Sequence, residues 1–152
     1  MIFRDARRDE VPAIVALLAD DILGADRETG PGDDAYWKAF DDIAADPRNR
    51  LIVADAEGQV AGTLQLTLIP GLSRHGMTRA QIEGVRVAAP WRGQGLGRAM
   101  IGWAIEESRR SGCGLVQLTS DKRRSHAIHF YEAIGFTATH EGLKLSLNHV
   151  PT

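Results

Sequence analysis

The strongest constraint on the fold comes from residues 85–100, VRVAAPWRGQGLGRAM, where a β-branched run passes into a helix-like run through three alternate glycines. Ordered glycine costs conformational entropy, so three of them at one junction need a reason. Gly93, Gly95 and Gly97 do not form a dinucleotide fingerprint, because neither register has a glycine at its sixth position. No Lys-Ser or Lys-Thr pair completes a P-loop either. A plain structural turn remains one interpretation.

The second interpretation of this junction is an anion-binding site. The N-terminus of a helix exposes unpaired N–H groups and carries a partial positive charge. Alternate glycines let a ligand approach those amides without meeting a Cβ atom. Arg92 and Arg98 flank the loop, and guanidinium groups bind phosphate through charge-assisted hydrogen bonds. The segment therefore predicts a phosphate-binding strand–loop–helix unit.

The periodicity of the rest of the chain predicts a mixed α/β fold, with helices packed on a central sheet. The first helix is expected to start at Asp9 as its N-cap, with Pro12 in the first turn. The order β-α-α-β-β-β-α-β-α-β-β is expected within one domain, residues 1–152. The elements are predicted at residues 2–7, 9–21, 35–45, 50–70 (a hairpin), 80–87, 96–112, 115–120 (a buried strand), 125–135 and 136–148 (a closing hairpin).

Composition is that of an ordinary soluble protein. Of 152 residues, 43% are hydrophobic and 25% are charged, and no apolar run approaches the roughly 20 residues of a membrane span. The N-terminus, MIFRDARRDE, lacks the apolar core of a signal peptide, so a cytoplasmic location is expected. The single cysteine, Cys113, excludes an internal disulfide and a multi-cysteine metal site, and a packing role is expected for it.

The formal net charge is −2, but the charge is unevenly distributed. Residues 1–50 carry twelve acidic and seven basic residues, whereas residues 51–152 carry eight acidic and eleven basic ones. Two explanations of this asymmetry remain open. The charges either lie on solvated helix faces, or the two halves of the chain face ligands of opposite charge. Because the basic residues form no stripe interleaved with aromatic ones, no nucleic-acid partner is expected.

The segment VRVAAPWRGQGLGRAM resembles motif A of the GCN5-related N-acetyltransferases (GNAT family). The signature of this motif, Arg/Gln-x-x-Gly-x-Gly/Ala, is matched by Arg92, Gly95 and Gly97. HAIHFYEAIGF is similar to motif B of the same family, and the order of elements agrees as well. The resemblance covers nearly the whole chain and implies a mixed, mostly antiparallel sheet flanked by helices. The motif B positions are Ala127, Phe130, Tyr131, Gly135 and Phe136.

The resemblance implies acetyl-CoA as co-substrate, and it implies no metal. The pyrophosphate would be held by the amides of residues 92–98, and the pantetheine arm would pair like a strand with the backbone of Val85 and Val87. One departure is Arg124, which stands where many family members carry asparagine. Arg124 either contacts the CoA phosphates or lies in a solvated loop, and the sequence leaves both interpretations open. The implied donor-binding residues are Val85, Val87, Arg92, Gly93, Gln94, Gly95, Gly97, Arg98 and Phe130.

Acetyl transfer to an amine needs a base for the ammonium and an acid for the departing thiolate. The resemblance makes Tyr131 the candidate acid and Glu83 the candidate base, acting through water. Strand alternation puts Glu83, Val85 and Val87 on one face. The alternative for Tyr131 is a non-catalytic role, in which its ring packs against CoA or the core. The alternatives for Glu83 are an ion pair with Arg86 and a position at an exposed strand end.

The sequence therefore predicts an acetyl-CoA-dependent N-acetyltransferase that moves an acetyl group to a small or peptidyl primary amine, by direct transfer in a ternary complex. The alternative is a non-catalytic acyl-CoA-binding regulatory module on the same fold. The acidic N-terminal half favours a cationic acceptor, with loops at 24–34 and 71–79 shaping its pocket. The resemblance also implies a homodimer formed through C-terminal strands. No membrane partner is expected.

Overall fold

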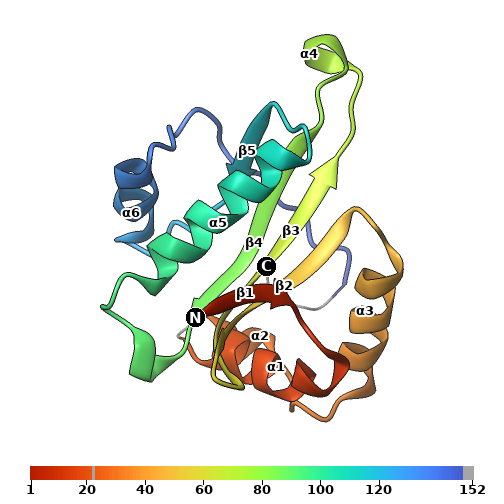
Figure 1. Ribbon diagram of the computed structural model, residues 1–152, viewed down its shortest axis with the longest axis vertical. Helices are drawn as coiled ribbons and strands as arrows, with labels where there is room; N and C mark the ends of the chain where they lie inside the picture. The colour runs from red at the N-terminus through yellow and green to blue at the C-terminus, as the bar shows by residue number, and fades with distance from the viewer. Residues whose placement is uncertain (22, 149–152) are drawn as a thin grey trace. The chain divides into compact units, whose positions relative to one another are not determined.

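The computed structural model describes residues 1–21 and 23–148 (Figure 1). Contacts within the chain divide it into two compact units, Met1–Gln117 and Leu118–Thr152. We describe each unit by itself, and the expectation of one domain over residues 1–152 stays a prediction.

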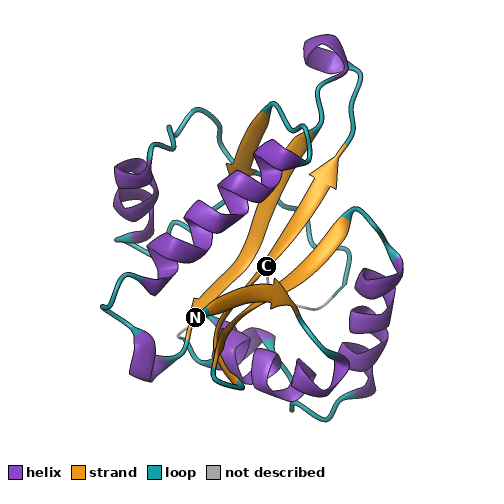
Figure 2. Ribbon diagram, in the orientation of Figure 1, coloured by secondary structure: helices purple, strands orange, loops and turns teal. Residues whose placement is uncertain are grey.

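A five-stranded sheet has the order β1-β2-β3-β4-β5, and all of it but Leu118 belongs to the first unit. Figure 1 labels the strands, and Figure 2 draws them in orange. The pairs β1–β2, β2–β3 and β3–β4 are antiparallel. The predicted hairpin is confirmed, and Glu57 and Gly58 at its turn have positive φ angles of 52° and 90°. The strands are Ile2–Asp5 (β1), Asn49–Ala56 (β2), Gln59–Ile69 (β3), Arg79–Val87 (β4) and Leu115–Leu118 (β5).

Helices of the first unit cover both faces of the sheet. Helices α1 and α5 both pack against β3 and β4, and the consecutive β3 residues 61–64 are all buried. The second predicted helix is confirmed as α3, where the side chain of Asp33 accepts a hydrogen bond from the N–H of Ala35 at 2.9 Å. The helices are Val11–Ala19 (α1), Gly24–Arg27 (α2), Asp34–Ala45 (α3), Ser73–Gly76 (α4) and Leu96–Arg110 (α5).

The start of α1 differs from the prediction. Asp9 is not the N-cap, because Arg8–Glu10 form a turn of 3-10 helix and α1 begins after Glu10. The buried Glu10 carboxylate accepts hydrogen bonds of 2.9 and 2.8 Å from Arg4 and one of 2.7 Å from the N–H of Arg7. These bonds tie β1 to the start of α1. They replace the cap that the sequence predicts.

Strand β4 contains a β-bulge opposite β3. The register steps from the pair Gln65–Glu83 to the pair Thr63–Arg86, so two residues of β4 lie opposite one residue of β3. Gly84 adopts a positive φ of 60° at this point. The bulge shifts the alternation of side chains along the carboxyl-terminal half of the strand.

The second unit holds helix α6, Ala127–Ile134, which ends as predicted at Gly135 with a φ of 119°. The closing hairpin predicted for residues 136–148 is wrong, because these residues form no strand. Leu143, Leu145 and Leu147 are 93%, 84% and 93% exposed. The alternation that predicts a strand therefore leaves three leucines uncovered.

Candidate active site

The glycine loop lies between the end of β4 and the start of α5. Gly93 and Gly95 have φ angles of 72° and 83°, in the left-handed region that favours glycine, and Gly95 is the N-cap of α5. Gly97 lies in the first turn of α5 without a positive φ, next to the exposed Arg98. Backbone conformation thus explains two of the three glycines. The backbone conformation of Gly97 does not by itself require glycine.

Side chains fix the conformation of this loop. Gln94 donates its Nε2 to the carbonyl of Pro90 at 2.9 Å, and Arg92 donates its Nε to the carbonyl of Val87 at 3.0 Å. Arg92 Nη2 also lies 3.1 Å from Asp20 Oδ2. The first N–H groups of α5 have no intrahelical acceptor, as at any helix start. The loop therefore presents backbone donors in a conformation that needs no ligand to form it.

The carboxyl-terminal half of β4 extends past β5. The N–H of Gly114 donates to the carbonyl of Thr78 at 2.9 Å, so both strands start at the same level, but β4 has nine residues and β5 only four. The strand predicted over residues 115–120 is thus shorter than expected, and it is half-buried rather than buried. Among the described residues of the first unit, no strand lies beside residues 84–87 on this edge.

Glu83 is exposed at the bulge and forms no hydrogen bond or ion pair within the part of the chain that the structure describes. The ion pair considered for it is absent, because Arg86 Nε lies 3.2 Å from Asp21 Oδ2. Residues opposite each other in a sheet share a face. The register therefore puts Glu83 and Arg86 on one face and Val87 on the other. The predicted common face of Glu83, Val85 and Val87 is wrong, since the bulge breaks the alternation.

Tyr131 lies on α6 in the second unit, within a cluster of aromatic rings. Its ring centroid is 5.1 Å from that of Phe130 and 5.8 Å from that of Phe136, and both pairs are edge-to-face. Phe130 is 38% exposed. The structure describes Tyr131 within this unit alone, so its role as the acid stays a prediction.

The basic run next to α6 is largely neutralised by its neighbours. Arg123 Nη2 lies 2.8 Å from Asp121 Oδ2, and Lys122 Nζ lies 3.4 Å from Glu141 Oε2. The N–H of Arg124 donates to the carbonyl of Asp121 at 2.9 Å. The three bonds hold the conformation of the run, but Lys122 and Arg123 are mostly exposed, so the reach of Arg124 to phosphate stays a prediction.

The described residues give little support to a covalent cysteine mechanism or to a metal site. Burial raises the pKa of the Cys113 thiol, which disfavours the thiolate that a covalent mechanism needs. No group of three or more His, Cys, Asp or Glu in residues 1–21 and 23–148 could hold a metal ion. Over the same residues, no helix combines the length and the apolar composition needed to cross a membrane.

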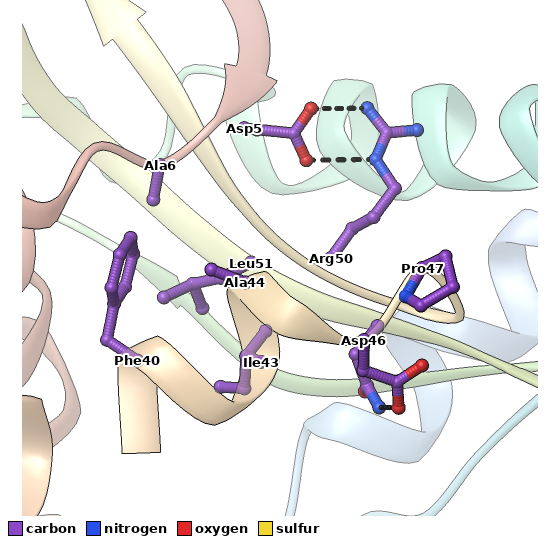
Figure 3. Close-up of a pocket in the computed structure, with 10 residues that line it drawn as sticks. Asp5, Ala6, Phe40, Ile43, Ala44, Asp46, Pro47, Arg50 and Leu51 are labelled. Carbon is purple, nitrogen blue, oxygen red and sulfur yellow. Dashed lines mark hydrogen bonds and ion pairs between the residues drawn. The ribbon is translucent and has the colours of Figure 1, made fainter. Parts of the chain in front are cut away.

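A pocket of about 330 Å³ lies beside α3 and β2, and no residue of the glycine loop lines it (Figure 3). Arg50 at this pocket pairs with both carboxylate oxygens of Asp5, at 2.9 and 3.0 Å, and with Glu107 at 3.2 Å. Asp46 accepts hydrogen bonds from the backbone of Arg48 and the side chain of Asn49. Because these charged groups satisfy one another, the pocket is a structural feature of the first unit.

Sequence reasoning missed the two aspartates after α1, Asp20 and Asp21, which pair with Arg92 and Arg86. Asp20 and Arg92 are 72 positions apart. Two adjacent acids after a helix usually indicate only a solvated end, so no local signal in the sequence reveals these ion pairs.

Comparison with known proteins identifies the family and supports the fold. The model of the acetyltransferase (GNAT) family matches residues 14–136. The chain is 37% identical over 90 residues to glucosamine 6-phosphate N-acetyltransferase from Trypanosoma brucei brucei, covering 59% of this chain and 59% of that protein. It is 32% identical over 106 residues to aminoalkylphosphonate N-acetyltransferase from Salmonella typhimurium, covering 70% of this chain and 68% of that protein.

A solved structure matches over a larger share of the chain. The crystal structure of a transcriptional regulator from Bacillus halodurans C-125 is 44% identical, with a TM-score of 0.94 over 96% of this chain and 99% of that one. The mixed α/β architecture predicted from the sequence is thereby confirmed. The chain belongs to the acetyltransferase (GNAT) family, which is a family of acyltransferase enzymes. Its match spans only 59% to 68% of the length of the two N-acetyltransferases named above.

Proposed function

We propose that this protein is an acetyl-CoA-dependent N-acetyltransferase that acetylates a primary amine by direct transfer in a ternary complex. One observation carries the proposal: a preformed loop of backbone donors follows β4 after one turn of 3-10 helix at Ala89–Trp91, and no strand among the described residues of the first unit lies beside residues 84–87. Acetyl-CoA is a polyanion joined to an amide-bearing arm. The anionic pyrophosphate suits the loop, and the amide-bearing arm suits the strand edge.

The loop of residues 92–98 is suited to the pyrophosphate of the donor. The start of α5 supplies unpaired N–H groups and the positive end of the helix dipole. Arg98 is exposed beside those amides and adds a charge-assisted donor. The absence of a side chain at Gly97 allows an oxygen atom to approach the first turn closely. Acetyl-CoA is the donor that GNAT acetyltransferases use.

The open edge of β4 is suited to the pantetheine arm, whose two amides can pair with Val85 and Val87 as a short extra strand would. At a β-bulge the extra residue is left out of the ladder, so its amide is available to another acceptor. We assign the Val85 amide as a donor to the oxyanion that forms when the amine attacks the thioester carbonyl.

In the proposed reaction, Glu83 takes a proton from the acceptor ammonium through water, and the neutral amine attacks the thioester carbonyl. The tetrahedral intermediate then collapses as the C–S bond breaks. Tyr131 gives its proton to the departing CoA thiolate, the acylated nitrogen gives its second proton to the resulting phenolate, and the neutral amide product carries the acetyl group. Within the described residues the exposed carboxylate of Glu83 forms no hydrogen bond or ion pair, which leaves it available for this role.

We further propose a cationic amine as acceptor. Helices α1 to α3 and the loops between them are rich in acids, and Asp26 and Asp34 are exposed there. The two N-acetyltransferase relatives are named for glucosamine 6-phosphate and aminoalkylphosphonate, so an acceptor that joins an amine to an anionic group is the natural comparison. We also propose, from the sequence alone, a cytoplasmic location.

The test is release of the CoA thiol from acetyl-CoA with a panel of amines: a polyamine, lysine, an aminoalkylphosphonate and glutamate. Thiol release is expected with at least one of them and fastest with the polyamine. Tyr131→Phe and Glu83→Gln should each lower kcat by about 100-fold, the lower end of general acid–base contributions. Glu57→Gln, at an exposed hairpin turn, is the matched control and should leave kcat unchanged.

A second candidate is favoured by the name of the 44% identical structure, a transcriptional regulator. A non-catalytic acyl-CoA-binding module would bind acetyl-CoA but release no thiol with any amine in the panel. In that case Tyr131→Phe would change neither binding nor release. Equal rates with all four amines would instead support the enzymatic function but contradict the proposal of a cationic acceptor.

A further inference from the structure

The end of α1 reaches the donor-binding stretch through two neighbouring ion pairs. Asp20 Oδ2 lies 3.1 Å from Arg92 Nη2, and the carbonyl of Asp20 lies 3.4 Å from the same nitrogen. Asp21 Oδ2 lies 3.2 Å from Arg86 Nε. Both arginines belong to the segment between the β4 bulge and the glycine loop.

The same arginines also bind the backbone carbonyls of this segment. Arg92 Nε donates to the carbonyl of Val87 at 3.0 Å, and Arg86 Nη1 donates to that of Val85 at 2.9 Å. These are the carbonyls that the proposed pantetheine pairing would use. Two arginine side chains thus bind the carbonyls that the proposed donor would use.

The two ion pairs differ in burial, and this difference separates their roles. The side chains of Arg86 and Asp21 are 18% and 21% exposed, whereas those of Arg92 and Asp20 are 51% and 59% exposed. A half-buried pair is costly to break because it leaves a charge without compensation. An exposed pair is worth little, so another anion can displace it easily. Only the Arg92–Asp20 pair is therefore exchangeable.

We propose that Asp20 is a positioning residue that competes with the donor for Arg92. The Asp20 carboxylate holds the guanidinium over the end of β4. The donor pyrophosphate takes Arg92 from Asp20 on binding, which costs part of the binding free energy. Asp20 thereby weakens donor affinity and keeps the cation neutralised until the donor arrives. This inference rests on the proposed function of residues 92–98.

The test is calorimetric titration of the full chain with CoA. Asp20→Asn should bind CoA about two- to five-fold more tightly than wild type, because an exposed ion pair is worth up to about 1 kcal/mol. Arg92→Ala should bind more weakly, and adding Asp20→Asn to Arg92→Ala should then change nothing. Asp26→Asn removes an exposed acid of the next helix and should leave CoA affinity within about two-fold of wild type.

The titrations distinguish failure of the proposed function from failure of the proposed competition. If wild type binds no CoA, the proposed function fails. If CoA binds and Asp20→Asn gives no gain, or the gain persists without Arg92 or is matched by Asp26→Asn, the competition is refuted. Dephospho-CoA keeps the pyrophosphate but lacks the ribose phosphate, so it should show the same gain. A gain confined to CoA would overturn the assignment to pyrophosphate.

Discussion

At the scale of single residues, the three glycines of the loop are not equivalent. Gly93 and Gly95 are required by their left-handed φ angles, whereas Gly97 lies in an ordinary helical turn. The sequence identified all three as candidates for close ligand approach. Only the backbone angles separate the two that shape the loop from Gly97, for which close approach of a ligand is our proposal.

Gly97→Ala is expected to weaken CoA binding by about tenfold, or about 1.4 kcal/mol, because a methyl group then projects at the approaching pyrophosphate. The measurement is CoA titration with circular dichroism as the check on folding. Gly102→Ala in the same helix, where an added Cβ meets no atom within 4 Å, is the control and should bind CoA as wild type does. Unchanged affinity in Gly97→Ala would remove the close-approach argument.

At the scale of elements, the junction of β1 and α1 depends on one buried carboxylate. Glu10 is 6% exposed, and its bonds to Arg4 lower the pKa of its carboxyl, with a further contribution from the N–H of Arg7. Arg4 also donates to Asp55 on β2 at 3.0 Å. A single guanidinium thus joins the sheet to the first helix.

Glu10→Gln should lower the free energy of unfolding by about 2 kcal/mol, because it weakens charge-assisted bonds in a buried place. Chemical denaturation at neutral pH measures this loss. Asp9→Asn, which removes the same charge from an 80% exposed side chain, should cost less than about 0.5 kcal/mol. Equal losses in the two variants would contradict the anchoring role.

The same bond network predicts a pH dependence. Since the folded pKa of Glu10 lies below its unfolded value, its contribution is complete above the unfolded pKa and is lost as pH falls through the folded pKa. As the pH falls below the unfolded pKa of a glutamate, about 4.3, wild type should therefore lose stability more steeply than Glu10→Gln. Parallel profiles for the two proteins would show that other groups carry the acid sensitivity.

Several elements follow from the sequence alone, and the reasons for the exceptions are physical. The hairpin, α3 and α5 have clear periodicity and strong turn or cap residues, and they form as predicted. The bulge at Gly84 is missed because EGVRV alternates well enough to be an unbroken strand, although an isolated glycine within a strand is a signal for a bulge. Asp9 has the chemistry of an N-cap, but Arg4 and Glu10 compete for the same junction and determine where α1 begins.

At the scale of the whole molecule, the exposed leucines of residues 143–148 bear on assembly. A homodimer formed through this segment stays a prediction, and it would cover Leu143, Leu145 and Leu147. Light scattering after size exclusion should give the mass of a dimer for wild type and of a monomer for Leu145→Lys. Lys144→Leu keeps the length and adds apolar surface at the neighbouring position, so it should stay dimeric. A wild-type monomer at all concentrations tested would reject the dimer.

The sequence by itself determined the order of most elements, the family and the position of the glycine loop. These depend on local periodicity, on turn chemistry and on two short motifs. Tertiary structure decided which face Glu83 occupies, where β5 stops beside β4, and that Asp20 and Asp21 hold Arg92 and Arg86. The physical reason is that register shifts and ion pairs depend on distances between segments far apart in the chain, and no local pattern encodes those distances.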